Sequence, residues 1–148
     1  MIDSFLKTLG GATIVGIIFV LAAQGTSKLA KLKRLGEYNK RRFNKAKFLI
    51  KTLSLTVVAI FIILINSLPG NYLLPISVIF GLYVGGTLSN FMEYCVYDKV
   101  YDYIPWPKLS KNADPEIANL ADFGILVGSL GIVIFAILNV IEHVSAGR

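Results

Sequence analysis

Two aspartates and two asparagines in the second half of the chain are spaced so that they could do acid–base chemistry together. Asn119 lies three residues before Asp122, which places both on one face of a helix. Asn90 stands in the same relation to Glu93 on an earlier predicted helix, so we expect the two amide–carboxylate pairs to point at one place. Two carboxylates that meet in poorly solvated surroundings share one proton, so one can take a proton from water while the other donates one. Such a pair would do the chemistry of aspartic proteases, and Asp102, in the loop before the last predicted span, is one candidate for the second acid.

The number and position of the histidine and cysteine residues exclude several other kinds of active site. The single histidine, His143, lies near the C-terminus on the face predicted to be opposite the acids, which excludes a Ser-His-Asp triad and a His-rich metal site. The single Cys95 excludes an intrachain disulfide and a Cys-rich zinc site. A magnesium site built from carboxylates alone stays open, with Glu93, Asp98 and the two catalytic candidates as oxygen ligands. For Asp98 we favour a solvated loop residue. For Asp102, catalysis and a solvated loop position both stay open. For Asp122, catalysis and a partly buried acid paired with a lysine both stay open.

The elements that must position these residues are apolar segments that cross a bilayer. Of the 148 residues, 55% are apolar and 16% are charged, against about 25% charged in soluble domains. Uncharged windows predict four spans, at about 8–27, 52–66, 72–92 and 117–141. A turn signal at 66–71 divides the second span from the third, and an N-cap at Asp114 followed by Pro115 is predicted to start the fourth helix. Backbone groups in lipid must pair within their own segment, so each span should be a helix.

The predicted fold class is therefore an all-α integral membrane protein, a four-transmembrane-helix bundle in a single domain over 1–148. Its first extramembrane loop is basic, because ten of the fifteen Lys and Arg residues fall between Lys28 and Lys51. Four spans put this loop and the loop at 93–116 on one face of the membrane and both termini on the other. We expect the basic loop to lie on anionic headgroups, and we expect no nucleic-acid partner. The contacting residues would be Lys40, Arg41, Arg42, Lys45 and Lys47.

Three segments, in order and at the ends of the predicted spans, resemble motifs of the bacterial lipoprotein signal peptidase (signal peptidase II) family. Residues 85–94, GGTLSNFMEY, resemble the third-span motif GGAxGNxxDR. Residues 100–104, VYDYI, resemble VxDF, and residues 118–122, ANLAD, resemble FNxAD. Residues 24–28, QGTSK, are a weaker match to the DQxTK that ends the family's first span. The resemblance covers most of the chain, and its specificity is concentrated in 85–122.

The resemblance implies an intramembrane aspartic endopeptidase that removes the signal peptide of prolipoproteins, cutting just before a cysteine that carries a diacylglyceryl group. By their positions in the motifs, Asp102 and Asp122 would be the catalytic pair. Asn90 and Asn119 would line the site and orient the acids or the scissile peptide, and Glu93 would supply a supporting hydrogen bond. The implied location is the bacterial cytoplasmic membrane, with several spans. We expect no metal and no cofactor, and the sequence does not indicate an oligomeric state.

The sequence also departs from the family pattern. Glu93-Tyr94 stand where the family has Asp-Arg. Ser89 replaces a glycine, and Gln24 replaces an aspartate. The first-loop motif NxGAAF has no clear counterpart. The positive-inside rule predicts that the basic loop stays on the inner side of the membrane, whereas the family has this loop on the outer side. Two alternatives therefore stay open: a catalytically inactive relative that acts as a lipopeptide-binding, lipid-binding or interaction protein, and a small carboxylate-lined transporter or magnesium channel.

Overall fold

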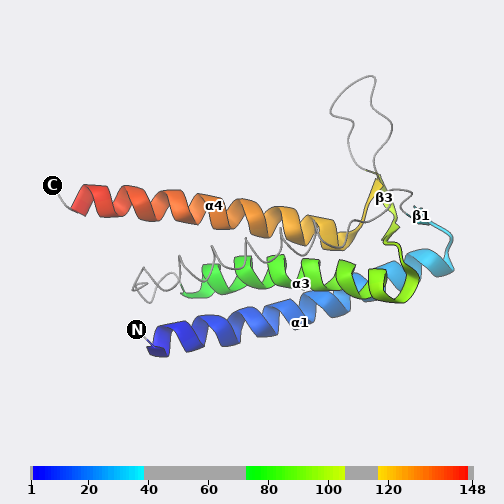
Figure 1. Cartoon of the computed structure of the whole chain (residues 1–148), viewed down its shortest axis with the longest axis horizontal. Coiled ribbons are helices and arrows are strands. Elements are labelled where there is room, and N and C mark those ends of the chain that lie inside the picture. Colours follow the sequence, from blue (N-terminus) through cyan, green and yellow to red (C-terminus); the bar gives the residue numbers. More distant parts are fainter. Residues whose placement is uncertain (1, 39–72, 106–116, 147–148) are drawn as a thin grey trace, which may run out of the picture.

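Three long helices run side by side in the computed structural model, which describes residues 2–38, 73–105 and 117–146 (Figure 1). They are α1 (Ile2–Leu32), α3 (Leu73–Tyr97) and α4 (Leu120–Ala146). Each contains a stretch that is long and apolar enough to cross a membrane, at Leu6–Leu32, Leu74–Tyr97 and Leu120–Ala146. These helices agree with the predicted integral membrane protein. The predicted span at 52–66 and most of the predicted basic loop lie outside the described residues.

The middle helix, α3, packs against both of the others. Two consecutive glycines of α3, Gly85 and Gly86, face different neighbouring helices. A Cβ on Gly85 would lie 2.7 Å from the carbonyl oxygen of Gly16 on α1. A Cβ on Gly86 would lie 2.5 Å from the carbonyl oxygen of Ala121 on α4. Only glycine permits such close approach of helix backbones. Because Asp122 follows Ala121, the contact at Gly86 also brings the acidic end of α4 against α3.

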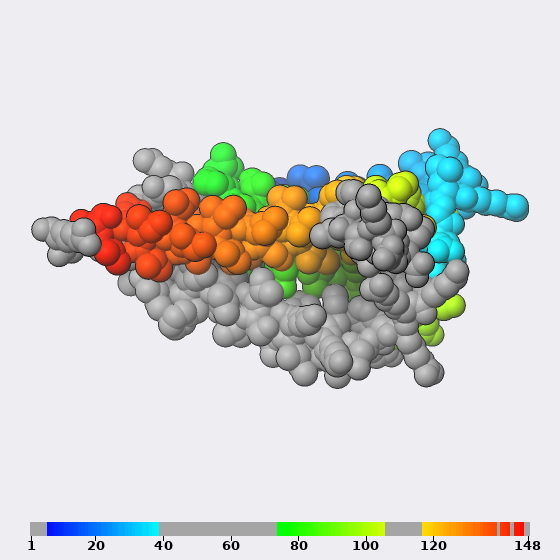
Figure 2. Space-filling model, turned by 90° about the horizontal axis from the view of Figure 1, so that it is seen from above, coloured from blue at the N-terminus to red at the C-terminus, as the bar shows by residue number. Residues whose placement is uncertain are grey.

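The third helix, α4, lies along one side of the molecule and exposes apolar side chains over most of its length (Figure 2). A soluble protein rarely leaves such a continuous apolar surface in water, whereas a membrane protein presents it to lipid tails. The exposed residues are Leu126, Val127, Leu130, Val133, Ile134, Ile137, Leu138, Val140, Ile141 and Val144.

In the described part of the chain, four two-residue strands gather at one end of the helices, where α1 and α3 end and α4 begins (Figure 1). β1 (Glu37–Tyr38) pairs antiparallel with β2 (Tyr101–Asp102). β3 (Ile104–Pro105) pairs antiparallel with β4 (Ile117–Ala118). The segment that carries Asp102 is therefore held on both sides by backbone pairing. The prediction of an all-α chain missed these strands, because two-residue strands leave no alternating pattern in a sequence.

The chain leaves α1 through a turn that allows β1 to reach β2. The Leu35 N–H donates to the carbonyl oxygen of Ala30 at 2.9 Å, and Arg34 has a left-handed φ of 53°, as in a Schellman motif. Gly36 follows with a φ of 118°. A Cβ at Gly36 would collide with the carbonyl oxygen of Asp102. Glycine is therefore required here both for its backbone angle and for its close approach to β2.

α4 begins at Leu120, so the predicted start at 117 is wrong. The predicted N-cap, Asp114, lies outside the described residues. Residues 117–118 pair with β3 instead, and this pairing prevents them from joining the helix. Asn119 takes the capping role: its Oδ1 accepts the backbone N–H of Asp122 at 3.0 Å, and an Asp122 carboxylate oxygen accepts the Asn119 backbone N–H at 3.1 Å. Such a reciprocal pair is a capping box. Asp122 therefore lies in the first turn of α4 and not two turns inside it.

Candidate active site

Asp102 and Asp122, the two predicted catalytic acids, are hydrogen-bonded to the same residue, Asn119. The side-chain amide of Asn119 donates to Oδ1 of Asp102 at 3.0 Å. Its backbone N–H donates to Oδ2 of Asp122 at 3.1 Å. Asp102 and Asn119 are 5% and 4% exposed, and Asp122 is half-buried. One strand and one helix terminus thus bring both acids to a single residue.

Asn90 joins this group from α3. Its side-chain amide donates to Oδ1 of Asp122 at 2.8 Å, and the residue itself is buried. Both carboxylate oxygens of Asp122 therefore accept hydrogen bonds from amide N–H groups. Within the part of the chain that the structure describes, Asp122 has no lysine partner of the kind that the sequence left open. Amides fix the direction of a carboxyl group without adding the positive charge that would hold it ionised.

Glu93 does not join the two acids, although the sequence predicted that it and Asn90 would point to one place. Its Oε2 accepts the backbone N–H of Tyr101 at 2.8 Å. Its Oε1 accepts the Lys31 ammonium at 3.0 Å and the hydroxyl of Ser27. Positions three apart on a helix differ in direction by about 60°, which is enough to turn Glu93 toward α1 while Asn90 faces α4. Glu93 therefore bonds to the backbone next to Asp102.

Replacing Glu93 with Gln should lower the stability of the protein. An amide cannot accept from all three of these donors, and a buried donor left without a partner costs about 1–3 kcal/mol. We expect a lower thermal unfolding midpoint in detergent. The matched control is Asp98→Asn, since Asp98 is an exposed acid just after the end of the same helix and its substitution should not move the midpoint. An unchanged midpoint in Glu93→Gln would contradict the anchoring role.

Tyr103 forms hydrogen bonds to three segments of the chain beside the acids. Its backbone N–H donates to the carbonyl oxygen of Ala118 at 2.9 Å. Its hydroxyl shares a hydrogen bond of 2.7 Å with Thr26 on α1 and accepts the backbone N–H of Leu120 at 3.3 Å. Neither Tyr103 nor Thr26 was predicted to be a site residue. The signals that could have found them are the VYDYI match at 100–104, which contains Tyr103, and the weak QGTSK match at 24–28, which contains Thr26.

Two of the departures from the family pattern contact each other. The side-chain amide of Gln24 donates to the carbonyl oxygen of Ser89 at 2.9 Å and to its hydroxyl at 3.0 Å. Ser89 directly precedes Asn90, so this bond ties α1 to α3 next to the acids. A glutamine and a serine can therefore act as a pair where the family pattern has an aspartate and a glycine.

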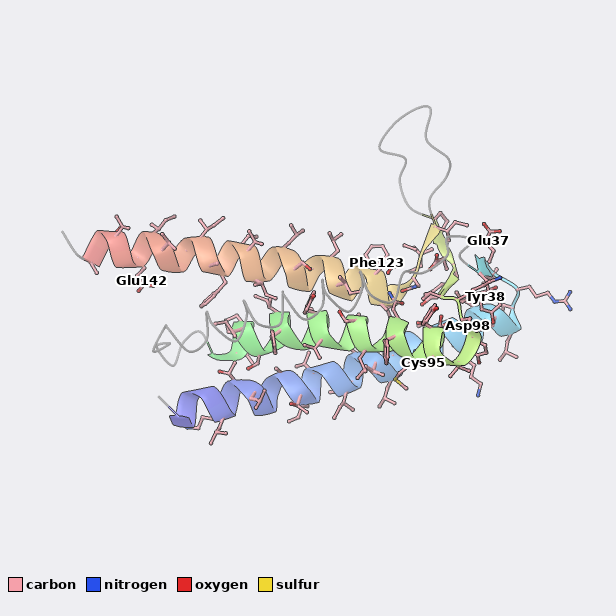
Figure 3. The ribbon with its side chains drawn as sticks, viewed as in Figure 1. Glu37, Tyr38, Cys95, Asp98, Phe123 and Glu142 are labelled. Atoms are coloured by element: carbon pink, nitrogen blue, oxygen red, sulfur yellow. The ribbon has the colours of Figure 1, made fainter. Side chains whose placement is uncertain are left out.

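The other candidates for chemistry lie apart from the acids. Asp98 and Cys95 are on the surface, and Glu142 is at the opposite end of α4 (Figure 3). Asp98 has a φ of 54° and its N–H donates to the carbonyl oxygen of Tyr94 at 2.8 Å, which ends α3 with a left-handed cap. Among the described residues, no three His, Cys, Asp or Glu side chains are grouped as metal ligands. The magnesium alternative therefore has no ligand cluster in that part of the chain.

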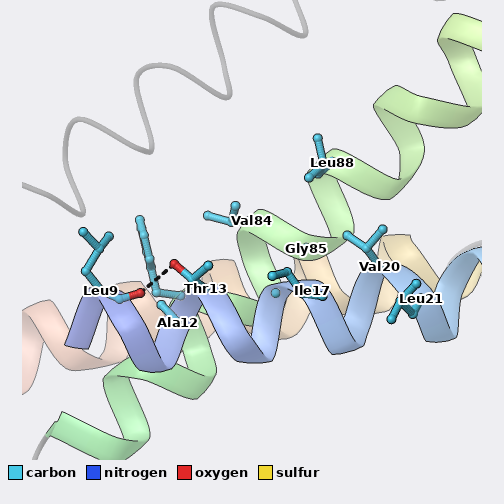
Figure 4. A pocket seen from close by; sticks show the side chains of 11 residues that line it. Leu9, Ala12, Thr13, Ile17, Val20, Leu21, Val84, Gly85 and Leu88 are labelled. Atoms are coloured by element: carbon cyan, nitrogen blue, oxygen red, sulfur yellow. Dashed lines mark hydrogen bonds between the residues drawn. The ribbon is translucent and has the colours of Figure 1, made fainter. Parts of the chain in front are cut away.

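A cavity of about 280 Å³ lies between α1 and α3 (Figure 4). Its lining is almost entirely apolar, and none of the predicted site residues contributes to it. The hydroxyl of Thr13, which lines it, donates to the carbonyl oxygen of Leu9 at 2.8 Å. Among the described residues that line this cavity, none carries a group that could act as an acid or base, and they give no support for catalysis there.

The fold and the site together define a class: a multi-pass membrane protein with two acids and two amides grouped at one end of its helices. The chain belongs to the signal peptidase (SPase) II family, whose model matches residues 34–138, more than half of the chain. Members of this family are proteases that act on prolipoproteins in membranes. The resemblance identified from the sequence motifs is thus confirmed.

Two solved structures of bacterial membrane enzymes are similar in fold. One, obtained by the in meso method at 2.3 Å resolution, has a TM-score of 0.62 and 19% identity, with 88% of each chain covered. Another, at 1.9 Å resolution by the same method, has a TM-score of 0.57 and 18% identity, covering 87% of this chain and 93% of that one. At these identities the likeness shows a common fold. A comparison with curated proteins finds no match.

Proposed function

We propose that this chain is an aspartic-type lipoprotein signal peptidase of the bacterial cytoplasmic membrane, with Asp102 and Asp122 as its catalytic pair. The observation that carries the proposal is the bridging position of Asn119, which donates to both carboxyl groups. A residue bonded to both acids keeps them facing a common space, where one water molecule could meet both. Catalysis by a carboxyl pair depends on that mutual orientation.

Peptide hydrolysis by such a pair requires one acid protonated and the other ionised. The ionised carboxylate takes a proton from water as the water oxygen attacks the carbonyl carbon of the scissile peptide. The protonated acid gives its proton to the carbonyl oxygen, so that a tetrahedral diol forms. When this intermediate collapses, the C–N bond breaks and the leaving nitrogen takes a proton. The products are a signal peptide with a new carboxyl terminus and a lipoprotein with a free amino group on its lipidated cysteine.

The location of the acids suits a substrate that is anchored by lipid. Asp122 lies in the first turn of an apolar helix, and Asp102 lies in the strands just beyond the helix ends. A cysteine with a diacylglyceryl group holds its peptide bond at the level where acyl chains meet headgroups. We infer that the scissile bond enters at this level, with Asn90 and Asn119 orienting the acids. A prolipoprotein segment is therefore the proposed substrate.

The direction of the helices supports a fourth span at 52–66. α1 and α3 run the same way, so Tyr38 and Leu73 lie at opposite ends of the molecule (Figure 1). The residues between Tyr38 and Leu73 connect these two ends, and the uncharged run that starts at Thr52 is the apolar part of that stretch. We propose that it crosses the membrane and completes a four-helix bundle.

The proposed function can be tested with the purified protein in detergent and a synthetic precursor peptide whose cysteine carries a diacylglyceryl group. We expect cleavage, with product masses that locate the cut just before the lipidated cysteine. The matched control is the same peptide without lipid, which we expect to be cleaved much more slowly. Binding of the lipidated peptide without any cleavage would contradict the proposal and select the inactive, lipopeptide-binding alternative.

A further inference from the structure

We propose that Lys31 is a positioning residue for peptide cleavage: through Glu93 it fixes the strand that carries Asp102. This inference rests on the proposed function, in which Asp102 is one of the two catalytic acids. Lys31 lies in the last turn of α1, a helix from which we assign no catalytic residue. Its effect on the reaction would pass through other side chains and not through contact with the substrate.

The first link is the ion pair between Lys31 and Glu93. The Lys31 ammonium lies 3.0 Å from Oε1 of Glu93, and the two side chains are 21% and 4% exposed. A buried carboxylate is stabilised by such a charge-assisted hydrogen bond, and removal of the cation leaves a charge without compensation. The direction of the Glu93 side chain therefore depends on Lys31, with the Ser27 hydroxyl as a second donor to the same oxygen.

The second link joins Glu93 to the backbone of β2. Oε2 of Glu93 accepts the Tyr101 N–H at 2.8 Å, and Tyr101 directly precedes Asp102. One carboxylate thus holds α1 with one oxygen and the acid-bearing strand with the other. A change in its direction moves the strand relative to α3. Catalysis is sensitive to small displacements, and a misplacement of 1 Å can cost about 100-fold in rate.

Three tyrosine rings surround the Lys31 ammonium and reinforce the same connection. The nitrogen lies 4.1 Å from the ring centroid of Tyr97, 5.6 Å from that of Tyr38 and 5.5 Å from that of Tyr101. These distances are within the range of cation–π attraction. Tyr38 and Tyr101 are directly opposite in the β1–β2 pair, and the Tyr101 hydroxyl donates to the carbonyl oxygen of Gly36 at 3.1 Å. Lys31 therefore contacts both strands as well as the carboxylate.

This arrangement gives a physical account of one departure from the family pattern. The family motif has an arginine directly after its acid, and this chain has Tyr94 in that position after Glu93. Here the positive charge beside the acid comes from α1, at Lys31. The charge is thus supplied from a different helix.

The variant that tests the inference is Lys31→Met, which keeps the length of the side chain and removes the charge. We expect hydrogen exchange of the Tyr101 amide to become at least about tenfold faster, because its acceptor is no longer held. With the lipidated peptide as substrate, kcat should fall about tenfold to 100-fold while KM changes less than about twofold. The matched control is Lys33→Met, since Lys33 is exposed near the end of the same helix and should change neither quantity.

A double variant tests whether Lys31 acts through Glu93. If it does, Lys31→Met combined with Glu93→Gln should lose no more kcat than the more severe single variant. Losses that multiply would overturn the inference. If Lys31→Met does not fold, Tyr97→Leu removes the nearest ring from a half-exposed position and should speed exchange of the Tyr101 amide in the same direction. Unchanged exchange in that variant would also overturn it.

The two readouts separate this inference from the proposed function. If the unmodified protein does not cleave the lipidated peptide, the proposed function fails, and exchange of the Tyr101 amide still decides whether Lys31 holds the strand. If the protein cleaves the peptide and Lys31→Met changes neither exchange nor kcat, the positioning role is wrong and the proposed function stands.

Discussion

Replacement of either Asp102 or Asp122 by Asn is expected to abolish cleavage of a lipidated precursor peptide. An amide has nearly the shape of a carboxyl group, but it can neither take a proton from water nor donate one to a carbonyl oxygen as an acid does. Loss of a positioned acid–base group typically costs about 100-fold to 10,000-fold in rate. We expect kcat of each single variant to fall by at least about 100-fold, measured with purified protein in detergent.

The control for this result is Asp98→Asn, which changes an exposed acid just after the end of α3 and should keep full activity. Asp102→Asn should also keep its thermal unfolding midpoint close to that of the unmodified protein. Asp122→Asn should lower the midpoint, because an amide can accept with only one of the two oxygens that now accept N–H groups. Activity is therefore measured well below the midpoint of each variant, so that a loss of activity cannot be attributed to unfolding. Full activity in either Asp102→Asn or Asp122→Asn would end the proposal that these two acids form the catalytic pair.

Two substitutions of Asn119 should separate its bond to Asp102 from its role as a helix cap. Serine is as good an N-cap as asparagine, so Asn119→Ser should still accept the Asp122 N–H and begin α4 normally. Its side chain is too short to replace the 3.0 Å bond to Asp102. We therefore expect Asn119→Ser to lower the unfolding midpoint less than Asn119→Ala does, and to lose about tenfold to 100-fold in kcat because the two acids are no longer held together.

Asn119→Ala loses both interactions and is expected to lose stability as well as activity. Removal of an N-cap side chain costs about 1 kcal/mol, which should appear as a lower unfolding midpoint in this variant than in Asn119→Ser. Equal and nearly full activity in both variants would show that the bridge between the acids does not matter for the reaction. Equal loss of stability in both would show that the cap geometry is not as described.

The membrane helices could be predicted from the sequence, and the motifs led us to expect Asp102, Asp122 and Asn119 in one site, whose catalytic role stays a prediction. Long uncharged windows predict membrane helices because lipid requires apolar side chains and internally paired backbone groups. The motif pattern predicted that Asp102 and Asp122 would share a site, and Asn119 bonds to both. The contact between Asn90 and Asp122 also follows from the motif, since both amides were expected to line the site.

The start of α4 was predicted incorrectly because two N-terminal signals compete in this stretch. Asp114 followed by Pro115 is a good local start, and Asn119 with Asp122 three residues later is another. The pairing of β3 with β4 decides between them, and that pairing joins residues that are distant in sequence. Local propensity cannot weigh such a tertiary contact.

The direction of Glu93 was missed for a related reason. Spacing on one helix places Glu93 near Asn90, but only the position of the neighbouring helix shows which partner is closer. Lys31 lies on α1, and its ammonium draws the carboxylate away from the acids. Gln24 and Thr26 likewise bond to segments that carry site residues. The supporting contribution of α1 therefore could not be read from the motifs of α3 and α4.

The most direct test of the central claim is a crystal structure with a lipopeptide analogue in which a hydroxyl-bearing carbon replaces the scissile carbonyl. Such a hydroxyl imitates the tetrahedral intermediate and seeks both members of a catalytic acid pair. We expect it to lie within hydrogen-bond distance of both Asp102 and Asp122, about 2.5–3.0 Å from an oxygen of each. A hydroxyl that contacts only one of these carboxyl groups, or neither, would contradict the claim.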